Sequence, residues 1–287
     1  MGELTPKRTE SVLTIEALEQ LCECAVVLSA NTSDRQVPSW REQKGSLIFS
    51  RQVATCLSLL RLLPSSSHYS AAKGRRVWDA PSAASLTRNI IESYCILYYV
   101  GIDTVTPEEN LFREYLWDYH ETFERFEMVR IGLPHSPNLK ELEAIRDAAQ
   151  SRLQGTPHFQ QLSSGHQTNL LAGKDFRVLS NVDICQRAGI SENYYRSEFK
   201  FFSAYVHTAP FAISQGAVFR AGTPEAEQFF KRIFQSALGW MALTVRDFVK
   251  LFPDQQSVLG ADVRECIGLW EVMSTWEKQD GFPQAKS

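Results

Sequence analysis

The sequence predicts an all-α protein, a multi-helix bundle of about seven to nine helices around a central hydrophobic helix at residues 82–100. Two observations support this fold class. Apolar residues recur at helical spacing through most of the 287 residues, and no alternating segments joined by a turn signal compete as a β-hairpin. The stretch NIIESYCILYYV is apolar on nearly every side, as expected of a helix that other helices surround.

Start and stop signals define four helices in the first half of the chain. Thr14 is an N-cap for the first helix, Pro64 ends the second and Gly101 ends the third. The fourth opens with the capping-box-like sequence TPEE at 106–109 and is expected to form an antiparallel hairpin with the third. The four helices cover residues 14–30, 46–63, 81–100 and 106–130.

The second half continues the helical pattern with one unclear segment. Residues 155–175 mix Gly, Ser, Thr, Gln and two histidines without a period, which predicts either a functional loop or a region of short helices. The helices divide into an N-terminal region at 1–80 and a main bundle at 81–276, expected to form one continuous domain. The predicted helices of this half cover residues 138–153, 182–188, 191–208, 223–252 and 257–276.

Composition limits the class of function. The net charge of −3 gives no long-range field to hold a polyanion, and the densest basic group, Lys73 with Arg75 and Arg76, is small. The chain has neither a signal-peptide core nor a run of ~18–20 apolar residues, which predicts a cytoplasmic protein without membrane contact. The six cysteines lie mostly in apolar helical patterns without CxxC spacing, so we expect reduced structural thiols, and neither a metal nor a cofactor.

Glu92 is the most unusual polar residue, because it lies inside the apolar run of the central helix. A buried carboxylate costs several kcal/mol unless it is paired or protonated. Arg88 precedes it by one helical turn, the spacing of a pair along one face. The two residues either line a ligand-binding pocket or form a buried ion pair that ties the central helix to its neighbours.

The helix predicted at 191–208 begins at the N-cap Ser191 and has two distinct stripes. The first stripe is apolar and predicts core packing through Tyr195, Phe199, Phe202 and Val206. The second lies one position further round and contains Arg196, Lys200, Ser203 and His207. We expect Arg196, Ser203 and His207 to bind a ligand if this edge faces Arg88 and Glu92; otherwise the histidine is a hydrogen-bonded structural residue.

The segment around Gly189 also suggests a helix-turn-helix DNA binder. The sequence DICQRAGIS, followed by Tyr195 and Phe199, resembles the turn and the aromatic positions of helix-turn-helix repressors. That resemblance implies a second helix that enters the major groove. The helix that would read the groove is rich in Tyr and Phe, however, which favours a role in the core.

Arg113 and His120 match the R-x(4–6)-H signature of HEPN-type ribonucleases. The resemblance implies a metal-independent cleavage of RNA by the paired Arg and His. Of the four Arg/His pairs at comparable spacing in this chain, this one lies in an unbroken predicted helix, although Glu114 stands where the family places Asn, His or Asp. The alternative is a solvated helix face with Trp117 and Phe123 packed inward.

Three segments together resemble an uncharacterised bacterial all-helical family of unknown function. They are TRNIIESYCILYYVG at 87–101, FREYLWDYHETFERF at 112–126 and GISENYYRSEFKFFSAYVHTAP at 189–210. The resemblance implies a helical bundle in which polar residues of the three segments converge, and it implies no activity. The matching residues are Arg88, Glu92, Arg113, Tyr195, Arg196, Ser203 and His207.

The sequence thus favours a cytoplasmic bacterial protein that binds a small ligand or a protein partner, within a stress or phage-defence system. The expected site is a polar pocket framed by Arg88, Glu92, Arg196, Ser203 and His207. Whether the protein is an enzyme stays open, with the HEPN-like ribonuclease as the alternative function and RNA as its partner. Self-association through the aromatic helices is a further expectation.

Overall fold

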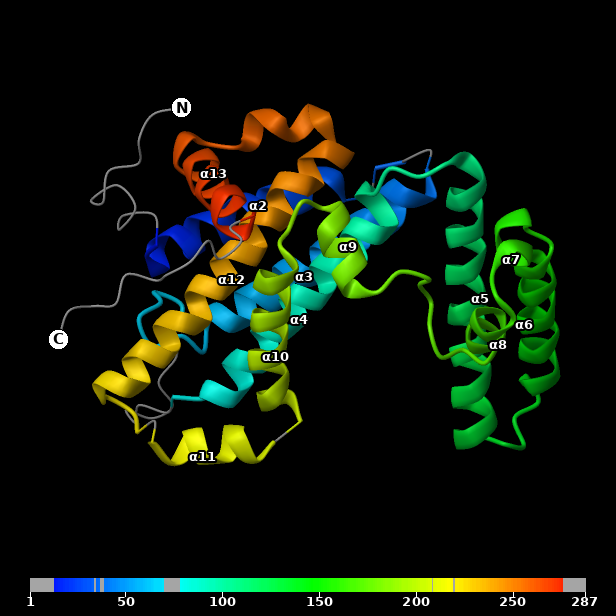
Figure 1. The fold of residues 1–287 in the computed structure, drawn as a ribbon, viewed down its shortest axis with the longest axis horizontal. Helices are drawn as coiled ribbons and strands as arrows, with labels where there is room; N and C mark the ends of the chain where they lie inside the picture. Colours follow the sequence, from blue (N-terminus) through cyan, green and yellow to red (C-terminus); the bar gives the residue numbers. More distant parts are fainter. Residues whose placement is uncertain are drawn as a thin grey trace. The chain divides into compact units, whose positions relative to one another are not determined.

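The computed structural model describes residues 13–33, 35–36, 39–69, 78–207, 209–218 and 220–275, and within these ranges it is all-α (Figure 1). Twelve α-helices, one π-helical turn and one 3-10 helix form these parts of the chain, and no strand occurs in them. The count exceeds the expected seven to nine because several helices are short. The basic group of Lys73, Arg75 and Arg76 lies outside the described ranges.

The chain divides into two compact units. One unit contains residues 1–103 and 181–287, and the other contains residues 104–180. This partition differs from the expected boundary at residue 80. The physical reason is that the inserted segment 104–180 buries a hydrophobic cluster of its own, whereas the N-terminal helices share a core with the C-terminal ones.

The larger unit is built on α4, which packs against α3, α9, α10 and α12. This confirms the prediction that the apolar segment near 82–100 is central. Helix α12 is equally central, since nearly every residue from Ser236 to Val249 is buried. The unit comprises α2 Ile15–Thr32, α3 Trp40–Leu60, α4 Ala80–Leu97, η2 Tyr98–Ile102, α9 Asn181–Arg187, α10 Glu192–Val206, α11 Pro210–Val218, α12 Pro224–Leu251, η3 Pro253–Val258 and α13 Ala261–Thr275.

Gly101 does not end the central helix as predicted. The chain continues through it as the π-helical turn Tyr98–Ile102. A Cβ at position 101 would lie 3.3 Å from Leu251 and 3.8 Å from the Cα of Gly45, so the glycine permits close approach of η2, α3 and α12. Tertiary packing, rather than helix termination, explains this glycine.

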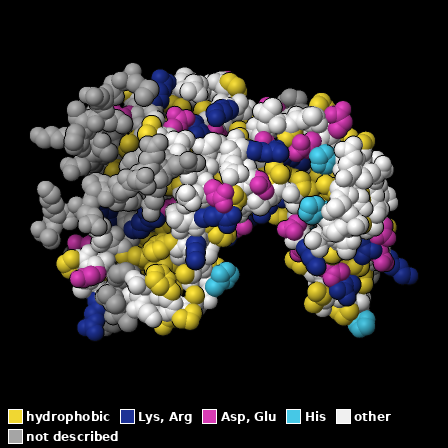
Figure 2. Space-filling view, viewed as in Figure 1, with side chains coloured by type: hydrophobic (Ala, Val, Ile, Leu, Met, Phe, Trp, Pro, Cys, Tyr) yellow, Lys and Arg dark blue, Asp and Glu magenta, His cyan; other side chains and the backbone are white. Residues whose placement is uncertain are grey.

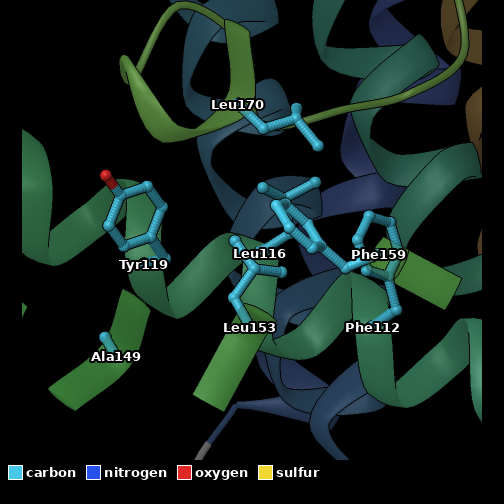
Figure 3. Close-up of a cluster of buried hydrophobic side chains, with 7 residues drawn as sticks. All are labelled: Phe112, Leu116, Tyr119, Ala149, Leu153, Phe159 and Leu170. Carbon is cyan, nitrogen blue, oxygen red and sulfur yellow. The ribbon is translucent and has the colours of Figure 1, made fainter. Parts of the chain in front are cut away.

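The smaller unit contains α5 Pro107–Gly132, α6 Leu139–Gln154, α7 Pro157–Gln161 and α8 Ser164–Leu171. Its core joins α5 to the three shorter helices through Phe112, Leu116, Tyr119, Ala149, Leu153, Phe159 and Leu170 (Figure 3). The expected hairpin of 81–100 with 106–130 is therefore wrong, because α5 pairs with α6 instead. The unclear segment 155–175 contains the short helices α7 and α8, which supply Phe159 and Leu170 to this core.

Helix caps explain why the elements begin where they do. The side chains of Thr14, Thr106, Ser191 and Thr223 each accept a hydrogen bond from a backbone N–H in the first turn of α2, α5, α10 and α12. Each of these threonines and the serine was expected at or next to a helix start. No helix within the described ranges is long and apolar enough to cross a membrane.

Candidate functional site

The contact between α4 and α10 brings Arg88, Glu92 and Ser203 together. Arg88 Nη1 donates to Glu92 Oε2 at 2.8 Å, and Arg88 Nε donates to the Ser203 hydroxyl at 3.0 Å. The guanidinium carbon lies 3.7 Å from the centroid of the Phe199 ring. Three of the five predicted ligand-binding residues therefore meet, and Phe199 completes the cluster, which we call the Arg88 cluster.

Helical spacing on both elements accounts for this geometry. Arg88 and Glu92 are one turn apart on α4, and Phe199 and Ser203 are one turn apart on α10. The neighbouring positions on α4 are buried, since Ile90, Ile91 and Tyr94 face other helices. Arg88 therefore has to lie along the edge of the α4–α10 contact, where its stem is covered and its head reaches the second helix.

The Arg88 cluster is open to solvent on one side. The Arg88 side chain is 14% exposed and that of Glu92 is 39% exposed. The expected burial of Glu92 is thus only partial, and the ion pair lies at the surface edge of the bundle. Within the described ranges, Arg88 Nη2 makes no hydrogen bond, although the other two guanidinium nitrogens each have one. One donor group of a fixed guanidinium therefore has no hydrogen-bond partner in the described parts of the chain.

Arg196 and His207 do not join the Arg88 cluster. Arg196 Nε donates to Glu192 Oε1 at 2.5 Å; the Arg196 side chain is largely exposed and that of Glu192 is half-exposed. His207 is exposed at the C-terminal end of α10, where its backbone N–H donates to the Ser203 carbonyl. Both residues lie on the solvent side of α10, together with Lys200.

The predicted core stripe of α10 is correct in part. Tyr195 and Phe202 are buried, and Phe199 is half-buried beneath Arg88. Val206 is 44% exposed, because α10 ends there, and Tyr205 is buried in its place. Burial raises the pKa of the Tyr195 phenol, as expected for an aromatic side chain packed in the core.

The helix-turn-helix resemblance corresponds to α9, the turn at Gly189 and α10. Gly189 has φ of 75°, a conformation that favours glycine, and Ser191 caps the second helix. The aromatic residues of α10 point inward, since the Tyr194 ring stacks on Trp240 with centroids 5.6 Å apart. The outer face alternates the cations of Arg196 and Lys200 with polar residues, so DNA binding stays a prediction.

The residues of the ribonuclease hypothesis lie in different environments. Arg113 is only 2% exposed and donates to Glu109 through Nε at 3.0 Å and Nη2 at 2.5 Å. His120 is half-buried against Phe176, with ring centroids 5.3 Å apart. The alternative of a solvated face is therefore wrong for Arg113, whose charge is neutralised inside the unit. The ribonuclease stays a prediction.

Sequence reasoning missed a buried polar network between α12 and α4, the helix that carries Arg88. Asp247 on α12 is fully buried and accepts hydrogen bonds from the Tyr94 hydroxyl at 2.8 Å, from Arg246 at 2.7 Å and from Lys250 at 2.7 Å. Burial raises the pKa of Tyr94 well above its usual range, and the charge of Asp247 adds to this. The signal was the RD pair inside the apolar run MALTVRDFV.

Metal ligation has no support within the described ranges, where no group of three or more His, Cys, Asp or Glu residues is placed to hold an ion. The cysteines of these ranges are free, and five of the six are buried. Cys95 Sγ lies 3.7 Å from Cys185 Sγ, a thiol contact between α4 and α9 rather than a disulfide.

Comparison with known proteins gives one match. No curated protein and no solved structure is significantly similar to the chain. The family of unknown function DUF5677 matches residues 46–220, a range that includes the Arg88 cluster and every other predicted site residue. This confirms the predicted relation to an all-helical family of unknown function. More than half of the chain is covered, and the protein therefore belongs to the DUF5677 family.

Proposed function

We propose that this protein is a binding protein whose Arg88 cluster recognises a carboxylate or phosphate group on a small ligand or a protein partner. The observation that carries the proposal is the fixed guanidinium of Arg88. Phe199, Ser203 and Glu92 hold it in one orientation, while Nη2 has no hydrogen-bond partner in the described parts of the chain.

The physical chemistry of arginine supports an anionic ligand. The planar guanidinium presents parallel N–H donors that match the two oxygens of a carboxylate or phosphate. An arginine already held by neighbours loses little rotamer entropy on binding, so more of the interaction energy appears as affinity. A ligand anion would share Nη1 with the half-exposed Glu92 and take Nη2 for itself.

The charges on the exposed side of α10 also favour an anionic ligand. Arg196, Lys200 and His207 follow one another along the helix at helical spacing, one position round from the buried stripe. Glu192 offsets one of these charges through its pair with Arg196. The charge of Lys200 adds attraction for an anion that approaches the Arg88 cluster, and this attraction should weaken with salt.

The cellular setting belongs to the same proposal. A cytoplasmic location and service in a bacterial stress or phage-defence system are part of this proposal. The free thiols and the lack of a membrane-spanning helix in the described ranges are compatible with that location.

A binding experiment with a matched control tests the proposal. The thermal unfolding midpoint of the wild type is measured with inorganic phosphate, citrate and a mixture of nucleotides, and then repeated for Arg88→Gln and Arg51→Gln. Arg51 is an exposed arginine on α3 and is not part of the Arg88 cluster. We expect a ligand-dependent rise for wild type and Arg51→Gln, and none for Arg88→Gln. Equal rises in all three proteins would contradict the proposal.

A further inference from the structure

The Arg88 cluster presents a hydrogen-bond acceptor as well as a donor. Glu92 Oε2 accepts from Arg88 Nη1 at 2.8 Å, whereas Glu92 Oε1 accepts no hydrogen bond in the described parts of the chain. Arg88 Nη2, on the other member of this ion pair, has no bond in these parts either. A negatively charged acceptor and a positively charged donor without partners therefore belong to one ion pair.

Ser203 adds a second donor on the α10 side of the cluster. Its hydroxyl oxygen accepts from Arg88 Nε at 3.0 Å and makes no other hydrogen bond within the described ranges. A serine hydroxyl that accepts one hydrogen bond still has its own proton to donate. In the planar guanidinium, Nη2 is next to both Nε, which Ser203 holds, and Nη1, which Glu92 holds. A carboxylate bound at Nη2 thus has a hydroxyl donor on one side and an acidic group on the other.

The opposite charges of the cluster decide which ligands suit it. A plain anion is attracted by Arg88 but repelled by Glu92, whose carboxylate is hydrogen-bonded to the same guanidinium. A ligand that carries an ammonium beside its carboxylate turns this repulsion into an attraction. Figure 2 shows acidic and basic side chains next to one another over α10 on the visible face of the larger unit. Mixed charge of this kind suits a ligand that carries both signs.

Exposure separates this ion pair from other Arg–Glu pairs at the same helical spacing. Arg113 is 1% exposed, so its guanidinium is closed to a ligand. Arg196 is 61% exposed and bonds to Glu192, and a side chain so exposed loses more rotamer entropy when it binds. Arg88 is 14% exposed, while its partner Glu92 is 39% exposed. The Arg88 cluster thus combines a fixed arginine with an accessible carboxylate.

We propose that the Arg88 cluster binds the α-carboxylate and α-ammonium groups of a free amino acid. This inference rests on the proposed function, because it assigns the anion-binding arginine to the carboxylate of the ligand. Arg88 Nη2 and the Ser203 hydroxyl donate to that carboxylate, and the ligand ammonium donates to Glu92 Oε1. Near about pH 7 a free amino acid carries both charges, so each is paired with its opposite in the site. The ligand is therefore a small zwitterion rather than a phosphate or a simple carboxylate.

Thermal unfolding of the full chain with amino acids and their blocked derivatives tests the proposal. Each standard amino acid is added at about 10 mM and constant ionic strength, and derivatives of the one that raises the midpoint most are then compared. The N-acetyl derivative lacks the ammonium, and the C-terminal amide lacks the carboxylate. From the concentration dependence of the midpoint, we expect each blocked form to bind at least about tenfold more weakly than the parent amino acid.

Glu92→Gln distinguishes a zwitterion from an anion by the sign of its effect. It should weaken the parent amino acid about fivefold to tenfold, because the ligand ammonium loses a charged partner, and should strengthen the N-acetyl derivative, because a repulsion is removed. Arg88→Gln should weaken both ligands. Glu143→Gln is the matched control, since Glu143 is 52% exposed and pairs with Arg146 in the smaller unit. It should leave both affinities within about twofold of the wild type.

The proposal is wrong if no standard amino acid raises the midpoint, if the N-acetyl derivative binds as tightly as its parent, or if Glu92→Gln strengthens both ligands. Any of these results, together with citrate or phosphate binding that Arg88→Gln abolishes, would leave the anion-binding function in place and remove only its zwitterionic ligand. Equal binding of every probe to wild type and Arg88→Gln would instead overturn the anion-binding function itself. Because Glu92→Gln is isosteric at a half-exposed position, it keeps the test decisive even if Arg88→Gln fails to fold.

Discussion

The guanidinium carbon of Arg88 lies 3.7 Å from the centroid of the Phe199 ring, across the contact between α4 and α10. Ser203, one turn beyond Phe199, accepts from Arg88 Nε at 3.0 Å. The arginine is therefore held both by the face of an aromatic ring and by a hydroxyl on the same helix. This arrangement couples the stability of the α4–α10 contact to the orientation of the guanidinium that we assign to ligand binding.

Replacing Phe199 by leucine should loosen Arg88 while keeping an apolar side chain at the site. We expect the free energy of unfolding to fall by about 1–2 kcal/mol from the lost cation–π contact and the poorer packing. Phe199→Tyr keeps the ring and should lie within about 0.5 kcal/mol of the wild type. Urea denaturation followed by tryptophan fluorescence measures both variants, and equal losses for the two would argue against the ring contact.

Glu198 on α10 and Arg232 on α12 form an ion pair, and the two side chains differ in burial. The Glu198 side chain is 3% exposed and that of Arg232 is 49% exposed. Burial raises the pKa of the Glu198 carboxyl, and Arg232 opposes this rise. Arg232→Ala leaves the carboxylate buried without its cation and should cost about 2–3 kcal/mol at neutral pH, below the full cost for a buried pair because the arginine is half-exposed.

The same pair predicts a pH dependence. A carboxyl whose folded-state pKa is raised destabilises the fold as pH rises above its unfolded-state pKa, because ionisation then opposes folding. Arg232→Ala raises the folded-state pKa of Glu198 further. The variant should therefore lose more stability, relative to the wild type, near about pH 8 than near about pH 5. Urea titrations at the two pH values provide the measurement. The double variant Arg232→Ala with Glu198→Gln should show a much weaker dependence on pH.

Gly239 and Gly268 offer a matched pair of helical glycines. A Cβ at position 239 would lie 2.6 Å from the ring of Trp270, which is itself buried, whereas a Cβ at position 268 meets nothing within 4 Å. Gly239→Ala should lower the free energy of unfolding by about 1–3 kcal/mol through overpacking. Gly268→Ala should raise it by about 0.5–1 kcal/mol through helix propensity. Stabilisation by both alanines would mean that α12 and α13 are not packed this closely.

The buried thiols should react slowly in the folded protein. Burial raises the pKa of Cys266 to about 12, and it raises that of Cys24 as well. For Cys56 and Cys185 the pKa is raised by the neighbouring thiols Cys22 and Cys95 together with burial. Since the thiolate is the reactive form, a chromogenic disulfide reagent at about pH 7.5 should label the native chain far more slowly than the guanidinium-unfolded chain. Fast stoichiometric labelling of all six thiols without unfolding would contradict the packing.

The ribonuclease hypothesis makes a separate prediction. Because Arg113 is neutralised by Glu109 in the interior of its unit, we expect its replacement by lysine to lower stability rather than to abolish a reaction. Incubation of labelled RNA with wild type and His120→Ala should give equal, background rates of cleavage. RNA cleavage that depends on His120 would support the HEPN-like alternative and would require Arg113 to leave its ion pair.

Local signals in the sequence determined the helical class and most helix starts. Caps such as Thr106 and Ser191 act within four residues of chain, and the apolar run of α4 is visible without knowing any neighbour. The i, i+4 spacing of Arg88 and Glu92 likewise fixed their pairing along one helix. These features depend on short-range geometry, which sequence alone specifies.

Only the tertiary structure decided which helix faces meet. Ser203 reaches Arg88 although 115 residues separate them, while Arg196, one turn before Phe199 and Lys200, remains in solvent with Glu192. The burial of Arg113, the close approach at Gly101 and the separate core of residues 104–180 depend on the same long-range choice of packing partners. Helical periodicity indicates which side of a helix is apolar. The packing of distant elements determines what covers that side, and therefore which polar groups remain accessible for function.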